Sequence, residues 1–334
     1  MTSFFRAAAA SLAALSCCGV VSATAQPVRP PQVVMISFDG ANDIALWQRS
    51  RRLAALTGAR FTYFLSCVFL LSPQTRHAYH PPQEVGRKRS NVGFALSRED
   101  VAARLQQIWL ARSEGHDIAS HGCGHFDGGK WRQKAWATEL SAFRTILRDA
   151  WTLNELPGEP AGWKTFAESE VAGFRAPYLS TSPAMLPALS ADGYRYDASG
   201  VSRGPVEPGR DHGLITFALP QVPEGPKHRP VIAMDYNLFV RHSGGVERGD
   251  PDGAFEERTL QAFRSAFEAA YNGDRTPLSL GFHFTLMNGG AYWRALERFA
   301  QEVCVRDDVA CISYADQVRR LEGVAEPSTT NVGG

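Results

Sequence analysis

Two histidines four residues apart, His121 and His125, lie in the run Gly-His-Asp-Ile-Ala-Ser-His-Gly-Cys-Gly-His at residues 115–125. This spacing places both imidazoles on one side of a helical turn or tight loop, close enough to share one cation. Gly122 and Gly124 give the backbone the freedom to point both rings inward. With a carboxylate, two histidines form the ligand set of a catalytic zinc site, which polarises a carbonyl and activates water. The pair therefore indicates metal-assisted hydrolysis, with a surface pair in a glycine-rich turn as the alternative.

Hydrolysis at such a site also needs a base for the water proton and an acid for the leaving group. Asp39 and Asp43 are the candidate bases, since both follow the strand-length apolar run at 33–38. His283 is the candidate acid, because it lies at the end of an apolar run at 278–284. We expect no Gly-x-Ser-x-Gly nucleophile elbow, and the chain has no His-Glu-x-x-His sequence, which excludes two common classes of hydrolase.

Strand-length apolar runs alternate with helix-length amphipathic runs along the chain. The predicted strands are 33–38, 60–67, 117–120, 173–176, 194–198, 231–238, 278–284 and 310–314. The predicted helices are 44–56, 97–114, 131–151, 183–191, 255–271 and 292–303, and residues 72–97 are predicted to form a long surface loop. This alternation predicts an α/β fold with a parallel sheet covered by helices, and seven or eight units fit a closed or nearly closed barrel better than an open sheet.

Polar residues gather at the ends of these predicted strands. They are Asp39, His121, Arg175, Asp235 and His283. In (β/α) barrels, the catalytic groups come from the C-terminal ends of several strands. We therefore expect these residues to meet at one site.

Four short motifs occur in a fixed order along the chain. They are Ser-Phe-Asp-Gly at 37–40, His-Gly-Cys-Gly-His at 121–125, Phe-Arg-Ala-Pro-Tyr at 174–178 and Leu-Gly-Phe-His at 280–283. This series resembles the polysaccharide deacetylase family, which is carbohydrate esterase family 4 with the NodB-like fold. The resemblance covers roughly residues 33–320 and implies a deformed (β/α)7-8 barrel.

The resemblance also implies acid–base roles for the matching residues. Asp39 matches the catalytic base of the first motif, and Arg175 would orient and charge-balance it. His283 matches the general acid. The carboxylate that tunes this histidine is Asp235 or Asp197.

The same resemblance assigns the groups that hold the metal and the substrate carbonyl. His121 and His125 match the metal-binding pair, with Zn2+ as the first candidate and cobalt or another divalent ion as alternatives. The backbone N–H of Tyr178 would help to hold the oxyanion. Trp131, Tyr178, Tyr236 and Trp293 are candidate sugar-stacking rings, although aromatic residues near helices more often belong to the core.

The chain departs from the family pattern at two positions. The family has a second aspartate after the first, and that residue is a metal ligand, whereas Gly40 follows Asp39 here. Three alternatives follow: Asp43 is the third ligand, or Asp39 binds the metal and another group is the base, or metal binding is weak and the protein is not catalytic. Gly122 also replaces the usual hydroxyl residue of the second motif.

Composition and the N-terminus indicate an exported protein of balanced charge. The 334 residues include 35 Lys and Arg against 34 Asp and Glu, so we expect no nucleic-acid partner.

Residues 1–25 have Arg6 before an Ala/Leu/Val-rich run and end in Ala-Thr-Ala, which predicts a cleaved signal peptide. A lipid anchor at Cys17 or Cys18 is the alternative. No later apolar run approaches the ~20 residues of a membrane span. We expect one catalytic domain at 26–322, a disordered tail at 323–334, and export to a periplasm or the medium.

Four cysteines remain after the predicted cleavage, at positions 67, 123, 304 and 311. An even number in an oxidising compartment favours disulfides, and four cysteines allow three connectivities. Cys304 and Cys311 flank a short polar turn and are the favoured pair, which leaves Cys67 with Cys123. In the competing interpretation, Cys123 is a metal ligand between the two histidines.

These features predict a secreted, metal-dependent deacetylase that hydrolyses N-acetyl or O-acetyl groups on a polysaccharide or glycoconjugate. Two alternatives remain. One is an amidase of the same fold that acts on a non-sugar C–N bond. The other is a non-catalytic carbohydrate-binding protein that lacks the second aspartate of the first motif.

Overall fold

The computed structural model describes residues 1–2 and 29–324, and every structural statement below refers to these residues. The predicted signal peptide at 1–25 and the predicted tail at 323–334 lie outside them, apart from residues 1–2 and 323–324. The chain separates into a unit of residues 1–30 and a unit of residues 31–334, and all elements described below belong to the second. No helix in the described ranges combines the length and apolar character that a membrane span requires.

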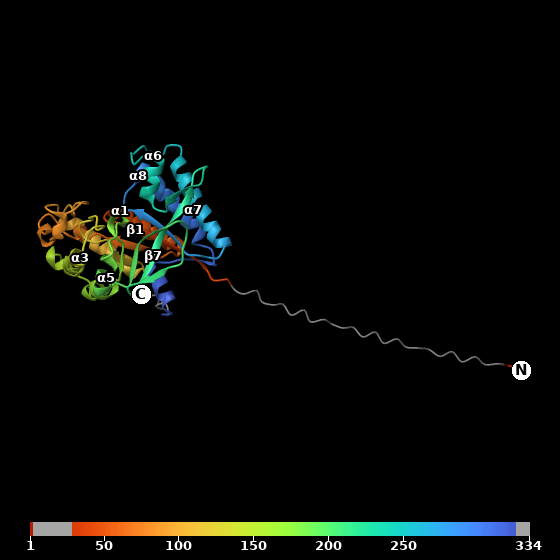
Figure 1. Ribbon diagram of the computed structural model, residues 1–334, viewed down its shortest axis with the longest axis horizontal. Coiled ribbons are helices and arrows are strands. Elements are labelled where there is room, and N and C mark those ends of the chain that lie inside the picture. The colour runs from red at the N-terminus through yellow and green to blue at the C-terminus, as the bar shows by residue number, and fades with distance from the viewer. Residues whose placement is uncertain (3–28, 325–334) are drawn as a thin grey trace. The chain divides into compact units, whose positions relative to one another are not determined.

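Parallel strands make up most of one curled sheet (Figure 1). At its centre, β1 (Gln32–Asp39) pairs in parallel with β9 (Leu278–His283) on one side and with β2 (Thr62–Leu65) and β10 (Val309–Cys311) on the other. From β2 the sheet continues in parallel through β3 (Asp117–Ser120), β4 (Gly173–Phe174), β5 (Tyr196–Ser202) and β7 (Leu214–Glu224). The carboxyl ends of these strands therefore lie at one edge.

An antiparallel segment, residues 209–234, brings the sheet back toward its start, and we call this segment the ribbon. Within it, β6 (Gly209–Asp211) and β8 (Arg229–Ile232) both pair antiparallel with β7. After β8, the Ala233 carbonyl accepts a hydrogen bond of 2.8 Å from the Gly281 N–H on β9. Met234 forms an isolated parallel bridge with Gly281. The sheet is thus curled almost into a closed ring, and the predicted deformed (β/α) barrel is confirmed.

Helices surround this sheet (Figure 1). The longer helices are α1 (Ile44–Thr57), α2 (Arg98–Ser113), α3 (Gln133–Leu153), α5 (Met185–Ala191), α6 (Asp235–Ser243), α7 (Ala254–Asn272), α8 (Met287–Val303) and α9 (Tyr314–Leu321). Short helical turns are η1 (Cys67–Leu70), η2 (Arg76–Ala78), η3 (Gln83–Val85), α4 (Trp163–Thr165), η4 (Phe166–Glu170) and η5 (Pro177–Leu179). Ser97 caps α2 through its side chain, and Gly58 ends α1 in the left-handed conformation.

An aromatic cluster lies under the carboxyl ends of β1 and β9. The Phe38 ring packs against the rings of Tyr63 and Trp293, with centroids 5.4 and 5.1 Å away. Trp293 also donates its indole N–H to the His283 carbonyl at 3.0 Å. Each fully buried aromatic side chain contributes roughly 1.5–3 kcal/mol through burial. The cluster therefore fixes the two strand ends that carry Asp39 and His283.

The ribbon and the C-terminus differ from the sequence-based expectation. The predicted strand at 231–238 is wrong beyond Ile232, because α6 begins at Asp235, and its buried residues Asp235, Leu238 and Phe239 have helical spacing. The long strand β7 was not predicted, since Pro220 and Pro223 interrupt its pattern and favour an edge or loop assignment. The predicted last strand ends at Cys311, and α9 follows it after a Ser313 capping box.

Candidate active site

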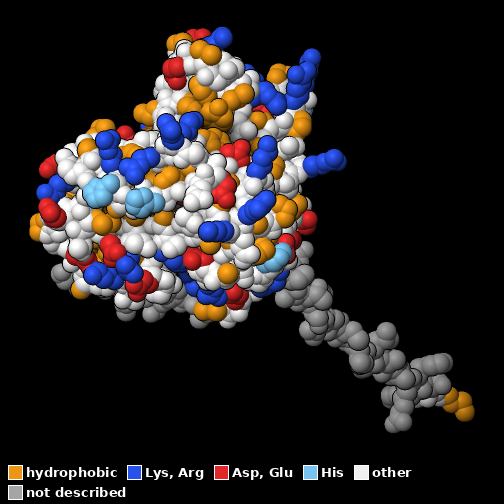
Figure 2. All heavy atoms as spheres, turned by 60° about the vertical axis from the view of Figure 1, so that its left-hand side comes forward, with side chains coloured by type: hydrophobic (Ala, Val, Ile, Leu, Met, Phe, Trp, Pro, Cys, Tyr) orange, Lys and Arg blue, Asp and Glu red, His pale blue; other side chains and the backbone are white. Residues whose placement is uncertain are grey.

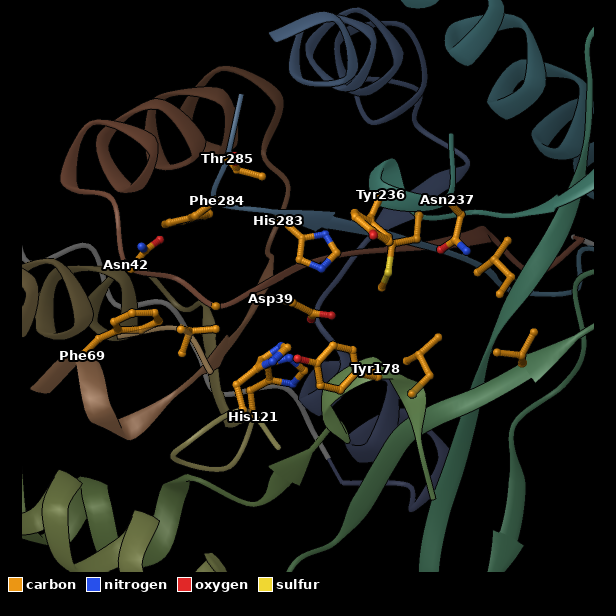
Figure 3. Close-up of a pocket in the computed structure, with 17 residues that line it drawn as sticks. Asp39, Asn42, Phe69, His121, Tyr178, Tyr236, Asn237, His283, Phe284 and Thr285 are labelled. Carbon is orange, nitrogen blue, oxygen red and sulfur yellow. The ribbon is translucent and has the colours of Figure 1, made fainter. Parts of the chain in front are cut away.

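The carboxyl ends of the parallel strands enclose a pocket of about 730 Å3 (Figure 3). Its chemically active lining residues are Asp39, His121, His125, Tyr178 and His283. Figure 3 shows Asp39, His121, Tyr178 and His283 around one central hollow. Arg175 and Asp235 lie behind this lining and are fully buried. The structure thus brings together the residues that the strand-end argument placed at one site.

Asp39 forms a buried ion pair with Arg175. The guanidinium Nη1 donates to Asp39 Oδ1 at 2.8 Å and to Ser37 Oγ at 2.9 Å. Its Nε donates to the Ala198 carbonyl, and its Nη2 donates to the Tyr314 hydroxyl. Burial alone favours a raised pKa for Asp39, but Arg175 and the two nearby histidines hold its pKa below the ordinary value. Asp39 is therefore a carboxylate near neutral pH, with its second oxygen free of this pair.

His283 is held by Asp235. Its Nδ1 lies 2.6 Å from Asp235 Oδ1, and its backbone N–H donates to Asp235 Oδ2 at 2.8 Å. Burial lowers the pKa of His283, but the Asp235 carboxylate outweighs that effect and raises the pKa above the ordinary value. Asp197, the alternative tuning residue, instead accepts from Ser199, and burial raises its pKa to about 6.

The sheet register sets Asp39 and His283 beside each other. They are direct partners in the parallel pairing of β1 with β9. Two titratable groups therefore face one pocket at the same level. Their environments move the two pKa values apart, in the arrangement that suits a base and an acid.

His121 and His125 present two neutral imidazoles, with ring centroids 5.0 Å apart. His121 Nδ1 lies 2.8 Å from the Arg175 carbonyl, which can only accept, so the ring proton is on Nδ1 and Nε2 has a lone pair. His125 Nδ1 is buried without a hydrogen-bond partner among the described residues. Burial, with the neighbouring His121, lowers the pKa of His125 to about 3. The buried, unpartnered Nδ1 of His125 lies on a ring next to that of His121, whose Nε2 has a lone pair. These two imidazoles are therefore suited to bind one metal ion.

A third ligand beside this pair is not in place. Asp43, one predicted ligand, caps α1 by accepting from the Leu46 N–H at 2.9 Å, and it does not line the pocket. Among the residues that the structure describes, no group of three or more His, Cys, Asp or Glu side chains is arranged to hold a metal ion. Gly40 lines the pocket with φ +65°, and a Cβ added there would meet no described atom within 4 Å. The two histidines are suited to bind a metal ion. Asp39 is the one acidic residue in the described pocket lining, so it is the carboxylate available as a further ligand.

Tyr178 lies in a strained turn at the pocket wall. Tyr178 and Leu179 have φ values of +60° and +54°, which are uncommon for residues other than glycine. The Leu179 and Ser180 N–H groups donate to the Ala176 and Pro177 carbonyls. Within the described chain, the N–H of Tyr178 has no acceptor, and its ring packs edge-on against His125 at 4.7 Å. This N–H is therefore free of described acceptors, and its contact with a substrate oxygen stays a prediction from the resemblance.

The loop that carries the histidine pair is anchored by groups that lie outside the four sequence motifs. Glu139, a buried carboxylate on α3, accepts from the N–H groups of Cys123 and Gly124 at 2.7 and 3.0 Å. Tyr79, from the predicted 72–97 loop, donates to the same carboxylate at 2.6 Å. A glutamate among the buried apolar positions of an amphipathic helix was the available signal. Gly122 has φ +69°, which explains why a residue with a side chain is disfavoured there.

Both favoured disulfides are present, and they exclude Cys123 as a metal ligand. Cys67 pairs with Cys123, next to the histidine pair, and Cys304 pairs with Cys311. The first disulfide joins the start of η1, just after β2, to the loop after β3.

Two other sequence features have structural roles. Trp131 and Trp293 are buried in the core and offer no sugar platform, whereas Tyr178 and Tyr236 are exposed beside the pocket. Residues 200–204 match the Gly-x-Ser-x-Gly pattern of serine hydrolases, but Ser202 ends β5 and donates to the Gly204 carbonyl. No helix follows that strand directly, so this serine does not form a nucleophile elbow.

Comparison with solved structures places this geometry in a known fold. A protein assigned as a polysaccharide deacetylase from Mycobacterium smegmatis aligns over 93% of this chain and 98% of its own, with 14% identity and a TM-score of 0.55. One from Pseudomonas aeruginosa PAO1, similarly assigned, aligns over 88% and 92%, with 15% identity and a TM-score of 0.53. This chain has the NodB-like fold of the polysaccharide deacetylases. The resemblance seen in the four motifs is confirmed at the level of fold.

A third similar structure broadens the chemistry found on this fold. The PuuE allantoinase aligns over 93% of this chain and 98% of its own, with 15% identity and a TM-score of 0.51. No protein-family model and no functionally curated protein matches the sequence. Identities of 14–15% show the fold alone, so the activity is argued from the site.

Proposed function

We propose that this protein is an exported, metal-dependent deacetylase that hydrolyses an acetyl amide or ester on a polysaccharide or glycoconjugate. The observation that carries the proposal is the pairing of Asp39 with His283 across β1 and β9. One is a carboxylate held by Arg175, and the other is an imidazole held by Asp235. Both face the pocket that the histidine pair lines.

The residues divide the reaction between them. Asp39 takes a proton from the attacking water as the oxygen adds to the acetyl carbonyl. The free N–H of Tyr178 donates to the oxygen that gains charge. His283 gives its proton to the departing nitrogen or oxygen as that bond breaks. The products are acetate and the free amine or alcohol.

A divalent cation held by His121 and His125, with zinc as the first candidate, supplies Lewis-acid polarisation in this site when bound. The residues around the pair prepare it for that task. The Arg175 carbonyl fixes the tautomer of His121, so that Nε2 is the nitrogen able to bind a metal. The Cys67–Cys123 disulfide and Glu139 hold the loop between the two histidines.

Export is part of this proposal. Two disulfides in a chain of this size are typical of proteins from oxidising compartments. The predicted signal peptide at 1–25 supports the same compartment. The face in Figure 2 intermixes positive and negative side chains.

One observation favours a second candidate function. Gly40 replaces the aspartate that completes the family's metal site, and Asp43 does not take its place. A carbohydrate-binding protein without catalytic activity is therefore the alternative. It predicts that the purified protein contains no metal.

The metal content of the native, tag-free protein separates these candidates. We expect about one zinc or other divalent ion per chain, lost in His121→Ala and retained in His212→Ala, a matched change at an exposed histidine. Acetate release from acetylated glycans should follow the same pattern. A protein that stays free of metal after reconstitution, and releases no acetate, would contradict the deacetylase proposal.

A further inference from the structure

The pocket extends to both sides of the line from His283 through Asp39 to His121 (Figure 3). On one side lie Asn42, Phe69, Phe284 and Thr285. On the other side lie Tyr236 and Asn237, with Val201, Ile232 and Met234 lining the same pocket. We call these last five residues the ribbon-side arm, because β8, the bridge to β9 and the start of α6 supply most of them.

The ribbon-side arm has an apolar wall that the fold holds in place. Met234 is buried, and its side chain packs over the strand that ends in His283: a Cβ added to Gly281 would lie 2.8 Å from Met234 Cε. Val201 is paired with Leu219 across β5 and β7. Ile232 is paired with Gln221 across β7 and β8. The apolar wall is therefore built on strands and does not depend on a loose loop.

Charge is scarce in this lining. Of the described residues that line the pocket, Asp39 is the one acid, and it is paired with Arg175; none is Lys or Arg. The other polar groups are neutral amides and hydroxyls, apart from the histidines. A volume of about 730 Å3 lies within the ~300–1,000 Å3 typical of small-molecule sites. These properties favour an uncharged, partly apolar group over a charged polymer.

The apolar surface continues outward from the arm. A second hollow shares Ile232, Tyr236 and Asn237 with the pocket and extends to Val240 on α6. Val201, Tyr236 and Val240 are 45%, 53% and 45% exposed. Exposed apolar residues that adjoin an apolar pocket mark a binding surface more often than scattered ones do. The arm thus leads from the reacting groups to a second hollow that has Pro230, Val231, Ile232 and Val240 in its lining, beside the polar side chains of Gln221, Asn237 and Arg241.

We propose that the substrate is an amphiphile, an acetylated compound whose alkyl chain lies in the ribbon-side arm while its acetyl carbonyl lies between Asp39 and His283. The reaction itself rests on the proposed function, but the binding of the chain does not. Transfer of each methylene from water into an apolar site improves affinity by up to about fourfold. Affinity should therefore rise steadily with chain length until the arm is filled.

Binding of 1-butanol, 1-hexanol and 1-octanol to the full-length mature protein tests this inference without turnover. Titration calorimetry should show a rise of about two- to fourfold per methylene. Ile232→Asp places a charge in the arm and should abolish that rise. Val305→Asp, a matched change at an exposed valine outside both hollows, should leave it intact. Affinity that does not change with length, or a rise equally lost in both variants, would overturn the inference.

Turnover then separates this inference from the proposed function. Among butyl, hexyl and octyl acetate, kcat/KM for acetate release should increase with alkyl chain length in the wild type and not in Ile232→Asp. Chain-dependent alcohol binding without ester or amide hydrolysis would leave the arm supported and the proposed function refuted. Acetate release from hydrophilic glycans without any chain dependence would leave the function supported and the arm refuted.

Discussion

The parallel strands and the ribbon contribute different parts of the same pocket. The ends of β1 and β9, with the segments that follow β3 and β4, supply the groups that can move protons or bind a cation. The ribbon and its neighbours supply Val201, Ile232 and Met234, which have no reactive groups. The carboxyl ends of parallel strands bring polar residues from distant parts of the sequence to one site. The antiparallel ribbon adds apolar residues to the pocket lining without moving those strand ends. Chemistry and recognition can therefore change independently.

The largest expected effect is at the parallel strands. His283→Ala should lower kcat on acetyl substrates by roughly 10²–10⁴-fold, because the departing group loses its proton donor. Thermal unfolding of the variant should remain cooperative, since His283 faces the pocket and its backbone contacts persist. His212→Ala provides the matched control at an exposed histidine.

The ribbon provides the contrast to that result. Ile232→Asp should mainly raise KM for long-chain esters, whereas His283→Ala should mainly lower kcat. If both variants change kcat alone, the separation between chemistry and recognition is wrong. Steady-state kinetics on butyl and octyl acetate makes the distinction.

The same division explains what the sequence could predict. Asp39, His121, Arg175 and His283 follow short apolar runs in motifs of fixed order, so both their strands and their meeting point were predictable. Strands that are buried on both faces appear in the sequence as short apolar runs with polar residues at their ends. This pattern can be recognised without knowledge of the tertiary structure.

The ribbon lacked such a signal. Prolines at 220, 223 and 230 interrupt its strands, and its pairing depends on contacts with β5 and β9 that local pattern does not encode. The placement of Asp43 was also beyond the sequence. An aspartate before a helix serves equally as a cap or as a ligand, and only the fold decides between them.

The two disulfides offer a second, smaller contrast. Cys67 and Cys123 are 56 residues apart, while Cys304 and Cys311 are 7 apart. In the chain-entropy model, the longer span stabilises the fold by about 4 kcal/mol and the shorter one by about 2 kcal/mol. The Cys67→Ser/Cys123→Ser variant should therefore lose more unfolding free energy in urea than Cys304→Ser/Cys311→Ser. The Cys67→Ser/Cys123→Ser variant should also lose metal, because the loop between His121 and His125 is no longer anchored. Equal metal content in the two double variants would argue against that anchoring role.

Gly40 allows a gain to be predicted at the strand ends. A side chain there meets no described atom, and aspartate tolerates a φ near +65° better than most residues. Gly40→Asp should bind zinc more tightly than the wild type, by about tenfold or more, at a stability cost of about 1–2 kcal/mol. Competition with a zinc chelator measures the affinity, and Gly40→Ala, with the same backbone strain and no ligand, is the control. Equal affinity in Gly40→Asp and Gly40→Ala would show that this position does not face the bound ion.

The smallest expected effect lies where the two regions meet, since Asp235 begins the helix after the ribbon yet holds His283 on β9. Its carboxylate raises the pKa of His283, so the imidazole keeps its proton to higher pH, and kcat/KM should fall as pH rises through that raised pKa. Asp235→Asn removes the charge and lowers the pKa of His283, so the alkaline limb of the pH profile should move to lower pH. Asp197→Asn, at the other buried carboxyl considered for this role, should leave the limb in place, because Asp197 is paired with Ser199. A limb that moves in Asp197→Asn and not in Asp235→Asn would reverse the assignment. The proton donor would then depend on the parallel strands alone, and α6 would have no part in tuning it.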